Sequence, residues 1–281
     1  MSSSQVQSSP PTQTPTLPSR SGVPAIRDRK GGQPLVMVTA YDAPSARAAV
    51  VAGVDLILVG DSLGMVVLGY EDTLKVTMED MVSHTAAVAR TKPPQLVVAD
   101  MPWTSYHRGA ADAVANAARL ILAGAGAVKL EGGAKRLEVL GAILDAEIPV
   151  MGHLGLTPQS VHAMGGFRVQ GRRPDEAKLL VEDAIAISEA GCFAIVLEGI
   201  PEDVAAEITG TVPVPTIGIG AGASCDGQVL VFHDIVGLGG TRAPRFARRY
   251  ADLEALAGQA VAQWAADVRG MRFPSTAESY H

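Results

Sequence analysis

LVVAD at residues 96–100 is the stretch from which the fold of this chain is predicted. Four consecutive apolar residues with no polar alternation are typical of a strand buried on both faces of a parallel sheet, and this run ends on Asp100. Three other apolar runs also end on an acidic residue: LILVGD at Asp61, AVKLE at Glu131 and FAIVLE at Glu198. Because parallel strands end at the same edge of a sheet, the four carboxylates are predicted to converge on one site.

Strand-like and helix-like segments alternate along the rest of the chain. Strands are predicted at 35–40, 56–60, 96–100, 127–131, 149–153, 193–198 and 215–219. Helices are predicted between them at 43–52, 77–90, 110–123, 134–146, 174–190 and 201–209. This regular alternation favours repeated βα units.

Seven strands and six helices are one unit short of a (βα)8 barrel of the TIM type. The stretch QVLVFHDIVG at 228–237 is the candidate for the eighth strand, with a short helix as the alternative, because its apolar residues do not alternate cleanly. An open doubly wound sheet is the competing architecture. We expect the barrel because functional polar residues end at least five strands, whereas an open sheet gathers its site at one switch point.

The two ends of the chain have different compositions. Residues 1–20 are rich in Ser, Pro, Thr and Gln and lack the basic start and apolar centre of a secretory signal, so residues 1–22 are predicted to be a disordered arm. Residues 23–281 are predicted to form one barrel domain with a helical segment at about 243–270. Its amphipathic stretch, 251–268, would cover the barrel wall or a neighbouring subunit.

Composition excludes several function classes. The net charge is −6 and no block of Lys or Arg stands out, which argues against a nucleic-acid or membrane-surface partner. No run of about 18 apolar residues occurs, so no membrane span is expected. Cys192 and Cys225 lack zinc-site or disulfide-framework spacing and are expected to be packing thiols in a reducing cytoplasm.

The four strand-end acids differ in their neighbours. Lys129 and Glu131 share one face of their strand, and a buried ion pair closing the barrel mouth is a structural alternative to a functional role. Adding Asp61 and Asp100 gives three acids against one lysine, which calls for a cation. Mg²⁺ uses one or two carboxylates and keeps waters or substrate oxygens in its other positions. Asp61 and Asp100 therefore suit direct ligation, and Glu131 suits a metal-bound water.

Each of these residues also has a structural alternative. Asp61 suits a cap in GDSLG, Asp100 suits binding of loop amides, and Glu198 suits capping of the next helix. His153 ends the fifth strand, where a structural and a catalytic role are equally open. The glycine-rich IGIGAG at 217–222 lacks the rest of a dinucleotide fingerprint and is interpreted as a tight turn at the barrel mouth.

Eight strings in this chain resemble the ketopantoate hydroxymethyltransferase family, in that family's order from about residue 26 to 250. They are TAYDAPSA, VGDSLGMVVLGYEDTLKVT, ADMPW, VKLEGG, GHLGLTPQSV, GGFRVQGR, VLEGIP and IGIGAG. The resemblance implies a (βα)8 barrel like that of phosphoenolpyruvate mutase and isocitrate lyase, with a divalent metal, usually Mg²⁺. It implies hydroxymethyl transfer from 5,10-methylenetetrahydrofolate to 3-methyl-2-oxobutanoate through a metal-stabilised enolate, and a homodecamer.

The resemblance also implies roles for single residues. Asp61 and Asp100 would be metal ligands with Glu131 near the metal, Ser62 and Lys129 would hold the substrate carboxylate, and Tyr41 and His153 would line the site. Glu198 would be the base that takes the C3 proton. Two rival functions are another Mg²⁺-dependent lyase or mutase acting on 2-oxo acids, and a non-catalytic oligomeric scaffold.

Overall fold

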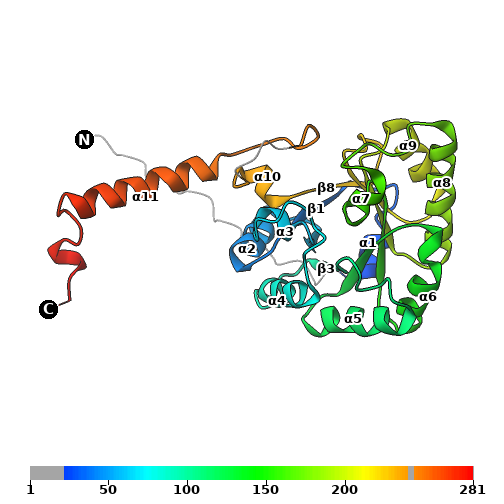
Figure 1. The fold of residues 1–281 in the computed structure, drawn as a ribbon, viewed down its shortest axis with the longest axis horizontal. Helices are drawn as coiled ribbons and strands as arrows, with labels where there is room; N and C mark the ends of the chain where they lie inside the picture. The colour runs from blue at the N-terminus through cyan, green and yellow to red at the C-terminus, as the bar shows by residue number, and fades with distance from the viewer. Residues whose placement is uncertain (1–21, 240–243, 281) are drawn as a thin grey trace, which may run out of the picture.

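Eight parallel strands close into a barrel in the computed structural model, which describes residues 22–239 and 244–280 (Figure 1). Each strand pairs with its neighbours in sequence, and β1 pairs with β8 to complete the ring. The strands are β1 Leu35–Thr39, β2 Leu56–Val59, β3 Leu96–Asp100, β4 Ala127–Glu131, β5 Val150–Gly155, β6 Ala194–Glu198, β7 Thr216–Ile219 and β8 Gly227–Leu230. The predicted barrel is confirmed, and an open sheet is excluded.

Six long helices lie outside the barrel at the predicted positions: α2 Ala43–Ala52, α4 Met78–Ala89, α5 Ala110–Leu122, α6 Leu137–Asp145, α8 Pro174–Glu189 and α9 Glu202–Thr211. Shorter helices occupy the connections: α1 Val23–Arg27, α3 Leu63–Val66, α7 Val161–Met164, α10 Phe232–Val236, and the 3₁₀ turns Ala134–Arg136, Pro158–Ser160 and Thr276–Glu278. Local sequence fixes several of the starts. Thr77, for example, caps α4 in a reciprocal capping box with Asp80.

Two apolar layers form the core. One fills the barrel and includes Leu56 and Leu58 of β2 and Leu96 and Val98 of β3; the other packs between the strands and the outer helices. Strand residues two apart point to the same face. The inward column that begins with Leu96 and Val98 therefore ends in Asp100, and the buried carboxylate forms the last layer of the barrel interior.

The candidate eighth strand at 228–237 is only partly correct. Strand β8 covers Gly227–Leu230, and the remainder turns into the short helix α10. Gly227 is needed where the barrel closes, because a Cβ atom at this position would lie 2.5 Å from the carbonyl oxygen of Leu35 on β1. Both predicted alternatives for this stretch, strand and short helix, are present one after the other.

The predicted C-terminal helix is α11, Leu253–Arg269, and it extends away from the barrel (Figure 1). None of its residues is buried, so it does not cover the wall of its own barrel. The other expectation, a neighbouring subunit, stays a prediction. The predicted disordered arm at 1–22 lies outside the described residues except for Gly22, and the domain boundary there stays a prediction. In the part of the chain that the structure describes, no helix is long and apolar enough to cross a membrane.

Candidate active site

A cavity of about 580 Å³ opens at the carboxyl ends of the strands. Seven of the eight predicted site residues line it: Asp61, Ser62, Asp100, Lys129, Glu131, His153 and Glu198. The eighth, Tyr41, is buried behind this lining, and its hydroxyl lies 2.8 Å from Ser62 Oγ. The strand ends therefore gather the predicted residues in one place.

Lys129 stands at the centre of the cavity floor. Its Nζ lies 2.9 Å from Asp100 Oδ1 and 3.1 Å from His153 Nδ1. Burial lowers the pKa of Lys129, but the carboxylates of Asp100, Glu131 and Asp61 outweigh burial and raise it above its ordinary value. The ammonium can only donate, so His153 accepts at Nδ1.

His153 is held as a neutral imidazole that faces Glu198. Burial and the neighbouring Lys129 charge lower the pKa of His153 well below its usual range. With Nδ1 accepting, the ring proton is on Nε2, which lies 3.2 Å from Glu198 Oε2. Burial raises the pKa of Glu198 to about 7, and Lys129 partly opposes this rise. The arrangement places a carboxyl group that titrates near neutrality beside a neutral histidine.

Asp61 and Glu131, two further buried carboxyl groups near Asp100, are like Glu198 destabilised in their charged form. Burial and then the Asp100 charge raise the pKa of Asp61 to about 7. Burial and then the Asp61 charge raise the pKa of Glu131 well above its usual range. The floor therefore holds four carboxyl groups against the one ammonium of Lys129.

This excess of carboxylates is compatible with a divalent cation. Asp61 and Asp100 are neighbours, since the Asp61 amide donates to Asp100 Oδ2 at 3.0 Å. Within residues 22–239 and 244–280, no three His, Cys, Asp or Glu side chains are grouped so that they could hold a metal ion. A pair of carboxylates is nevertheless sufficient for Mg²⁺, which fills its remaining positions with water or substrate oxygens. The donor set thus fits the predicted direct ligands, and the metal assignment stays a prediction.

Comparison with known proteins shows the family to which this chain belongs. The sequence profile of the family described as ketopantoate hydroxymethyltransferase matches residues 20–276. The chain belongs to the ketopantoate hydroxymethyltransferase family. It is 56% identical over 256 residues to the 3-methyl-2-oxobutanoate hydroxymethyltransferase of Nitratidesulfovibrio vulgaris strain DP4, covering 91% of this chain and 83% of that protein. It is 54% identical over 259 residues to 3-methyl-2-oxobutanoate hydroxymethyltransferase 2 of Bradyrhizobium diazoefficiens, covering 92% and 88%.

Solved structures place this ketopantoate hydroxymethyltransferase family member among barrels of the predicted type. A phosphonopyruvate hydrolase in complex with oxalate and Mg²⁺ matches with a TM-score of 0.60 at 16% identity, over 91% of this chain and 92% of the other. A 2,3-dimethylmalate lyase of the PEP mutase/isocitrate lyase superfamily matches with a TM-score of 0.56 at 16% identity, over 90% and 84%. At such low identity the likeness concerns the fold, and it confirms the predicted fold class.

Gln159 is a site residue that the sequence analysis missed. It is buried in the 3₁₀ turn Pro158–Ser160, and its Nε2 donates to Asp61 Oδ2 at 2.8 Å and to the Met101 carbonyl at 2.9 Å. Its Oε1 accepts from the Tyr106 hydroxyl at 2.6 Å, and its backbone amide donates to Glu131 Oε2 at 3.0 Å. One neutral side chain on the β5 loop therefore ties together the ends of β2, β3 and β4. The sequence feature that could have identified Gln159 is its place in LGLTPQS, six residues after His153.

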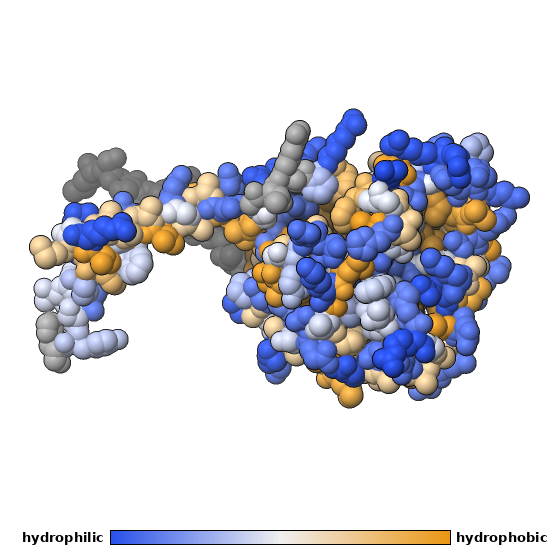
Figure 2. All heavy atoms as spheres, in the orientation of Figure 1, coloured by the Kyte–Doolittle hydropathy of each residue, from blue (hydrophilic) through white to orange (hydrophobic). Residues whose placement is uncertain are grey.

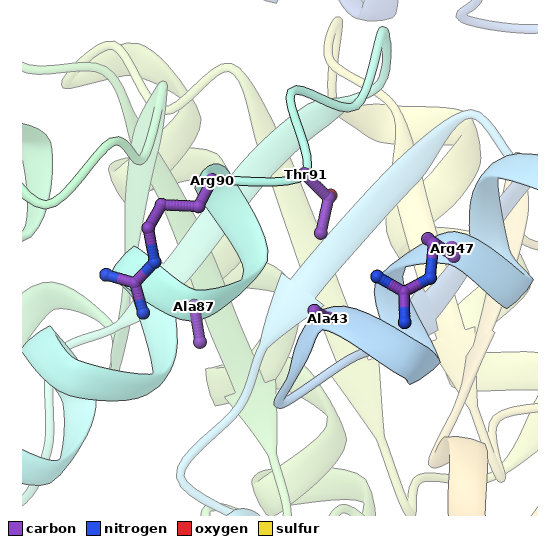
Figure 3. A pocket seen from close by; sticks show the side chains of 5 residues that line it. All are labelled: Ala43, Arg47, Ala87, Arg90 and Thr91. Atoms are coloured by element: carbon purple, nitrogen blue, oxygen red, sulfur yellow. The ribbon is translucent and has the colours of Figure 1, made fainter. Parts of the chain in front are cut away.

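A second hollow of about 360 Å³ lies on the outer wall between α2 and α4, lined by Ala43, Arg47, Ala87, Arg90 and Thr91 (Figure 3). It contains none of the family's predicted site residues, and none of the described residues that line it is a carboxylate or a histidine. The cavity at the strand ends is therefore kept as the candidate active site.

Proposed function

We propose that this chain transfers a hydroxymethyl group from 5,10-methylenetetrahydrofolate to 3-methyl-2-oxobutanoate and so forms ketopantoate, the 2-dehydropantoate of pantothenate and coenzyme A synthesis. The observation that carries the proposal is the polarity of one cavity: a base with a pKa of about 7 at Glu198 faces the cationic Lys129 across His153. Relatives with this named activity, 54–56% identical to the chain, support it. We propose a cytoplasmic location for the same reason.

Substrate binding is assigned to the side of the cavity that carries Lys129 and Ser62. An ammonium and a hydroxyl together suit a carboxylate, the first by charge and the second by donating a hydrogen bond. Burial raises the pKa of Tyr41, so its phenol stays protonated beside Ser62 Oγ and orients that hydroxyl. Gly60 keeps this region open, because a Cβ atom there would lie 2.9 Å from Ser62 Oγ.

Proton removal is assigned to Glu198. Its carboxylate takes the proton from C3 of the oxo acid, the C–H electron pair becomes the C2–C3 double bond, and the ketone oxygen gains the negative charge. Water adds to the methylene carbon of the folate, both C–N bonds of that carbon break, and tetrahydrofolate leaves with formaldehyde as the one-carbon unit. The nucleophilic C3 then adds to the formaldehyde carbon, whose oxygen takes the proton held by Glu198 and becomes the hydroxyl of the product. A pKa near the working pH suits this task, because the base is unprotonated yet still basic enough to accept the proton.

Asp61 and Asp100 would hold a divalent metal, with Glu131 reaching it through a water. A bound Mg²⁺ would act as a Lewis acid on the ketone oxygen. Asp61→Ala is expected to weaken Mg²⁺ affinity about tenfold or more, because it removes one of only two carboxylate ligands. Titration calorimetry of the substrate-free protein measures this directly. Asp112→Ala is the control, because the half-exposed Asp112 on α5 is paired with Arg108 outside the cavity. An unchanged affinity would remove Asp61 from the ligand set.

The rival lyase or mutase function is less well supported. Such enzymes need a nucleophilic cysteine or a cluster of anion-binding arginines at the mouth, and the described residues that line the cavity include neither type. A non-catalytic scaffold would not require Lys129 and four carboxyl groups inside one cavity, because charged groups are costly to bury.

One experiment separates these functions. With Mg²⁺ present and no folate, the wild-type protein in D₂O is expected to remove the C3 proton signal of 3-methyl-2-oxobutanoate in NMR spectra. Chelation of the metal should stop the loss. A signal that persists with metal bound would contradict an enolising enzyme and favour the scaffold.

We also propose a homo-oligomer, a decamer by family resemblance. Helix α11 supports this, because its apolar residues are exposed on a helix that stands away from the barrel; these include Leu256, Val261, Trp264 and Val268. In Figure 2 hydrophobic residues lie along α11 among hydrophilic ones. A helix with an apolar face requires a surface to cover it, and a second copy of the chain supplies one.

A further inference from the structure

Thr73 is a buried residue of the cavity at the strand ends that has no role in the proposed mechanism. It lines the cavity and is 2% exposed, as little as Asp61 and Asp100 on the floor at 4% and 3%. Its Oγ1 atom is buried and has no hydrogen-bond partner among the described residues. A buried hydroxyl group without a partner is costly, because it has lost its hydrogen bonds to water. This hydroxyl group is therefore available to a ligand in the cavity.

Two other hydroxyl groups of the cavity have partners within the protein. Ser62 Oγ lies 2.8 Å from the hydroxyl of Tyr41. Thr39 Oγ1 accepts from the backbone amide of Phe232 at 2.8 Å. Thr73 differs from both, because in the part of the chain that the structure describes no group donates to its Oγ1 or accepts from it.

Local packing fixes the position of Thr73. Its carbonyl oxygen accepts from the Val76 amide at 3.2 Å, which closes a turn over residues 73–76. Val76 packs on the helix α3, since a Cβ atom added to Gly64 would lie 2.6 Å from Val76 Cγ2. Helix α3 begins directly after Ser62, one of the predicted substrate-binding residues. The turn that carries Thr73 is thus packed on the substrate-binding segment, which preorganises the hydroxyl group.

The proposed reaction creates one new polar group, the hydroxymethyl oxygen. The oxo acid itself brings a carboxylate, which is assigned to Lys129 and Ser62, and a ketone oxygen, which is assigned to the metal. Once Glu198 has given up its proton it can only accept a hydrogen bond from the new hydroxyl group. The hydroxymethyl oxygen then still needs a donor. A threonine hydroxyl group can supply that hydrogen bond without adding charge.

We propose that Thr73 Oγ1 donates a hydrogen bond to the hydroxymethyl oxygen of the product. This assignment rests on the proposed function, which supplies the one-carbon unit. When C3 adds to the formaldehyde carbon, the π electrons of the C=O bond move to oxygen, and that oxygen takes the proton from Glu198. Thr73 keeps its own proton and stabilises the negative charge that develops on the oxygen. It has no part in removing the C3 proton.

A comparison of two ligands isolates this hydrogen bond. Ketopantoate and 3,3-dimethyl-2-oxobutanoate differ only in the hydroxyl group, and neither has a C3 hydrogen to exchange. Calorimetry with Mg²⁺ and no folate is expected to show that the wild type binds ketopantoate about tenfold or more tightly than the analogue. Thr73→Val keeps the shape of the side chain and should lower this preference about tenfold, with the Kd of the analogue within about twofold of wild type. Thr73→Ser keeps the hydroxyl group and should retain the preference.

Two rates test the same assignment during the reaction. C3 deuterium exchange of 3-methyl-2-oxobutanoate with no folate present should stay within about twofold of wild type in Thr73→Val. Formation of ketopantoate from both substrates should slow about tenfold, because the oxygen gains its charge only when the C–C bond forms.

Thr85→Val is the matched control. Thr85 lies in α4, is 0% exposed, and has an Oγ1 that is likewise buried without a hydrogen-bond partner among the residues described, but it does not line the cavity. Thr85→Val should change neither the ligand preference nor the two rates. Both valine variants replace a hydroxyl group that the chain leaves unpaired, so neither should lower the melting temperature of the ligand-free protein.

The outcomes separate this assignment from the proposed function. An unchanged ligand preference in Thr73→Val, with C3 exchange intact in the wild type, would overturn the assignment and leave the proposed function standing. Equal weakening of both ligands would place the Thr73 hydroxyl group at the oxo-acid carboxylate and would also overturn it. A wild-type protein that does not exchange C3 would overturn the proposed function itself. If Thr73→Val does not fold, Thr73→Ala also removes the hydroxyl group and decides on the same ratio of affinities.

Discussion

At the scale of single residues, neighbouring groups distinguish carboxyl groups that look alike in the sequence. Burial raises the pKa values of Asp61 and Glu198 to about 7. The charged form of Asp61 is also repelled by the Asp100 carboxylate, whereas Glu198 lies against the neutral His153. A bound cation would relieve the repulsion between Asp61 and Asp100, and uptake of a proton relieves the cost of burying the Glu198 charge. The same residue type is thereby suited to metal binding at one position and to base catalysis at the other.

Glu198 leads to a prediction about pH. A base works only when it is unprotonated, so the rate of C3 deuterium exchange should rise as pH is raised through about 7, the pKa of Glu198. Glu198→Gln keeps the side-chain volume, removes the base and should slow exchange about 100-fold or more. NMR in buffered D₂O over a pD series measures both effects. Glu207→Gln, an exposed change on α9, is the control; wild-type exchange in Glu198→Gln would refute the assignment.

Gln159 is predicted to be a positioning residue. Gln159→Met keeps the length of the side chain but removes the donor to Asp61 and the acceptor for Tyr106. Hydrogen bonds to charged groups contribute about 1.5–3 kcal/mol, so kcat should fall roughly 10- to 100-fold and Mg²⁺ affinity should fall with it. Steady-state kinetics and metal titration give the two values, and the melting temperature reports any general loss of structure.

The matched control for Gln159 is Gln170→Met. The Gln170 side-chain amide donates to the Arg168 carbonyl in an exposed loop, so kinetics and Mg²⁺ binding should stay at wild-type values. If Gln159→Met changes the melting temperature alone, Gln159 has a structural role and does not position Asp61.

At the scale of elements, the barrel was predictable where a strand is one continuous apolar run. The runs at β2, β3, β4 and β6 are recognised locally, and their terminal acids follow from them. Strand β8 is different, because its four residues are defined by pairing with the preceding β7 and with β1, which is far away in sequence. Gln159 was missed for the same reason, since a neutral amide in a loop acquires its role only when the fold brings Asp61 and Tyr106 to it.

The contact between β5 and β6 depends on Gly155. This residue pairs with Glu198, has a φ of +92°, and would place an added Cβ atom 2.3 Å from the Glu198 carbonyl oxygen. Gly155→Ala is therefore expected to lower the free energy of unfolding by about 1–3 kcal/mol and to displace the base. Thermal denaturation and C3 exchange should both report the change.

A second glycine provides the comparison for Gly155. Gly141 lies within α6, and a Cβ atom there would meet nothing within 4 Å. Gly141→Ala should leave exchange unchanged and stabilise the protein by about 0.5–1 kcal/mol, because alanine favours the helix. If Gly155→Ala is as stable and active as Gly141→Ala, the close approach of the two strands is not required.

At the scale of the whole molecule, α11 is a long helix with no buried residue in the part of the chain that the structure describes. Strand β7 is followed directly by β8, and only the short α10 follows β8. The first strand has an outward side chain, Val36, that is 51% exposed. An isolated helix is only marginally stable in water, and this one has Val261, Trp264 and Val268 exposed along one face. The fold of one chain thus leaves both an uncovered apolar face and an incompletely covered wall.

The resulting prediction concerns assembly. Trp264→Glu combined with Val268→Glu places two charges on the apolar face of α11, and burying such side chains is worth about 1.5–3 kcal/mol each. The double variant should therefore elute as a smaller species than the wild type at equal concentration, measured by size-exclusion chromatography with light scattering. Gln259→Glu adds a charge on the opposite face of the same helix and should keep the wild-type mass. If all three proteins have the same mass, α11 does not contact a second copy, and the homo-oligomer must use another surface.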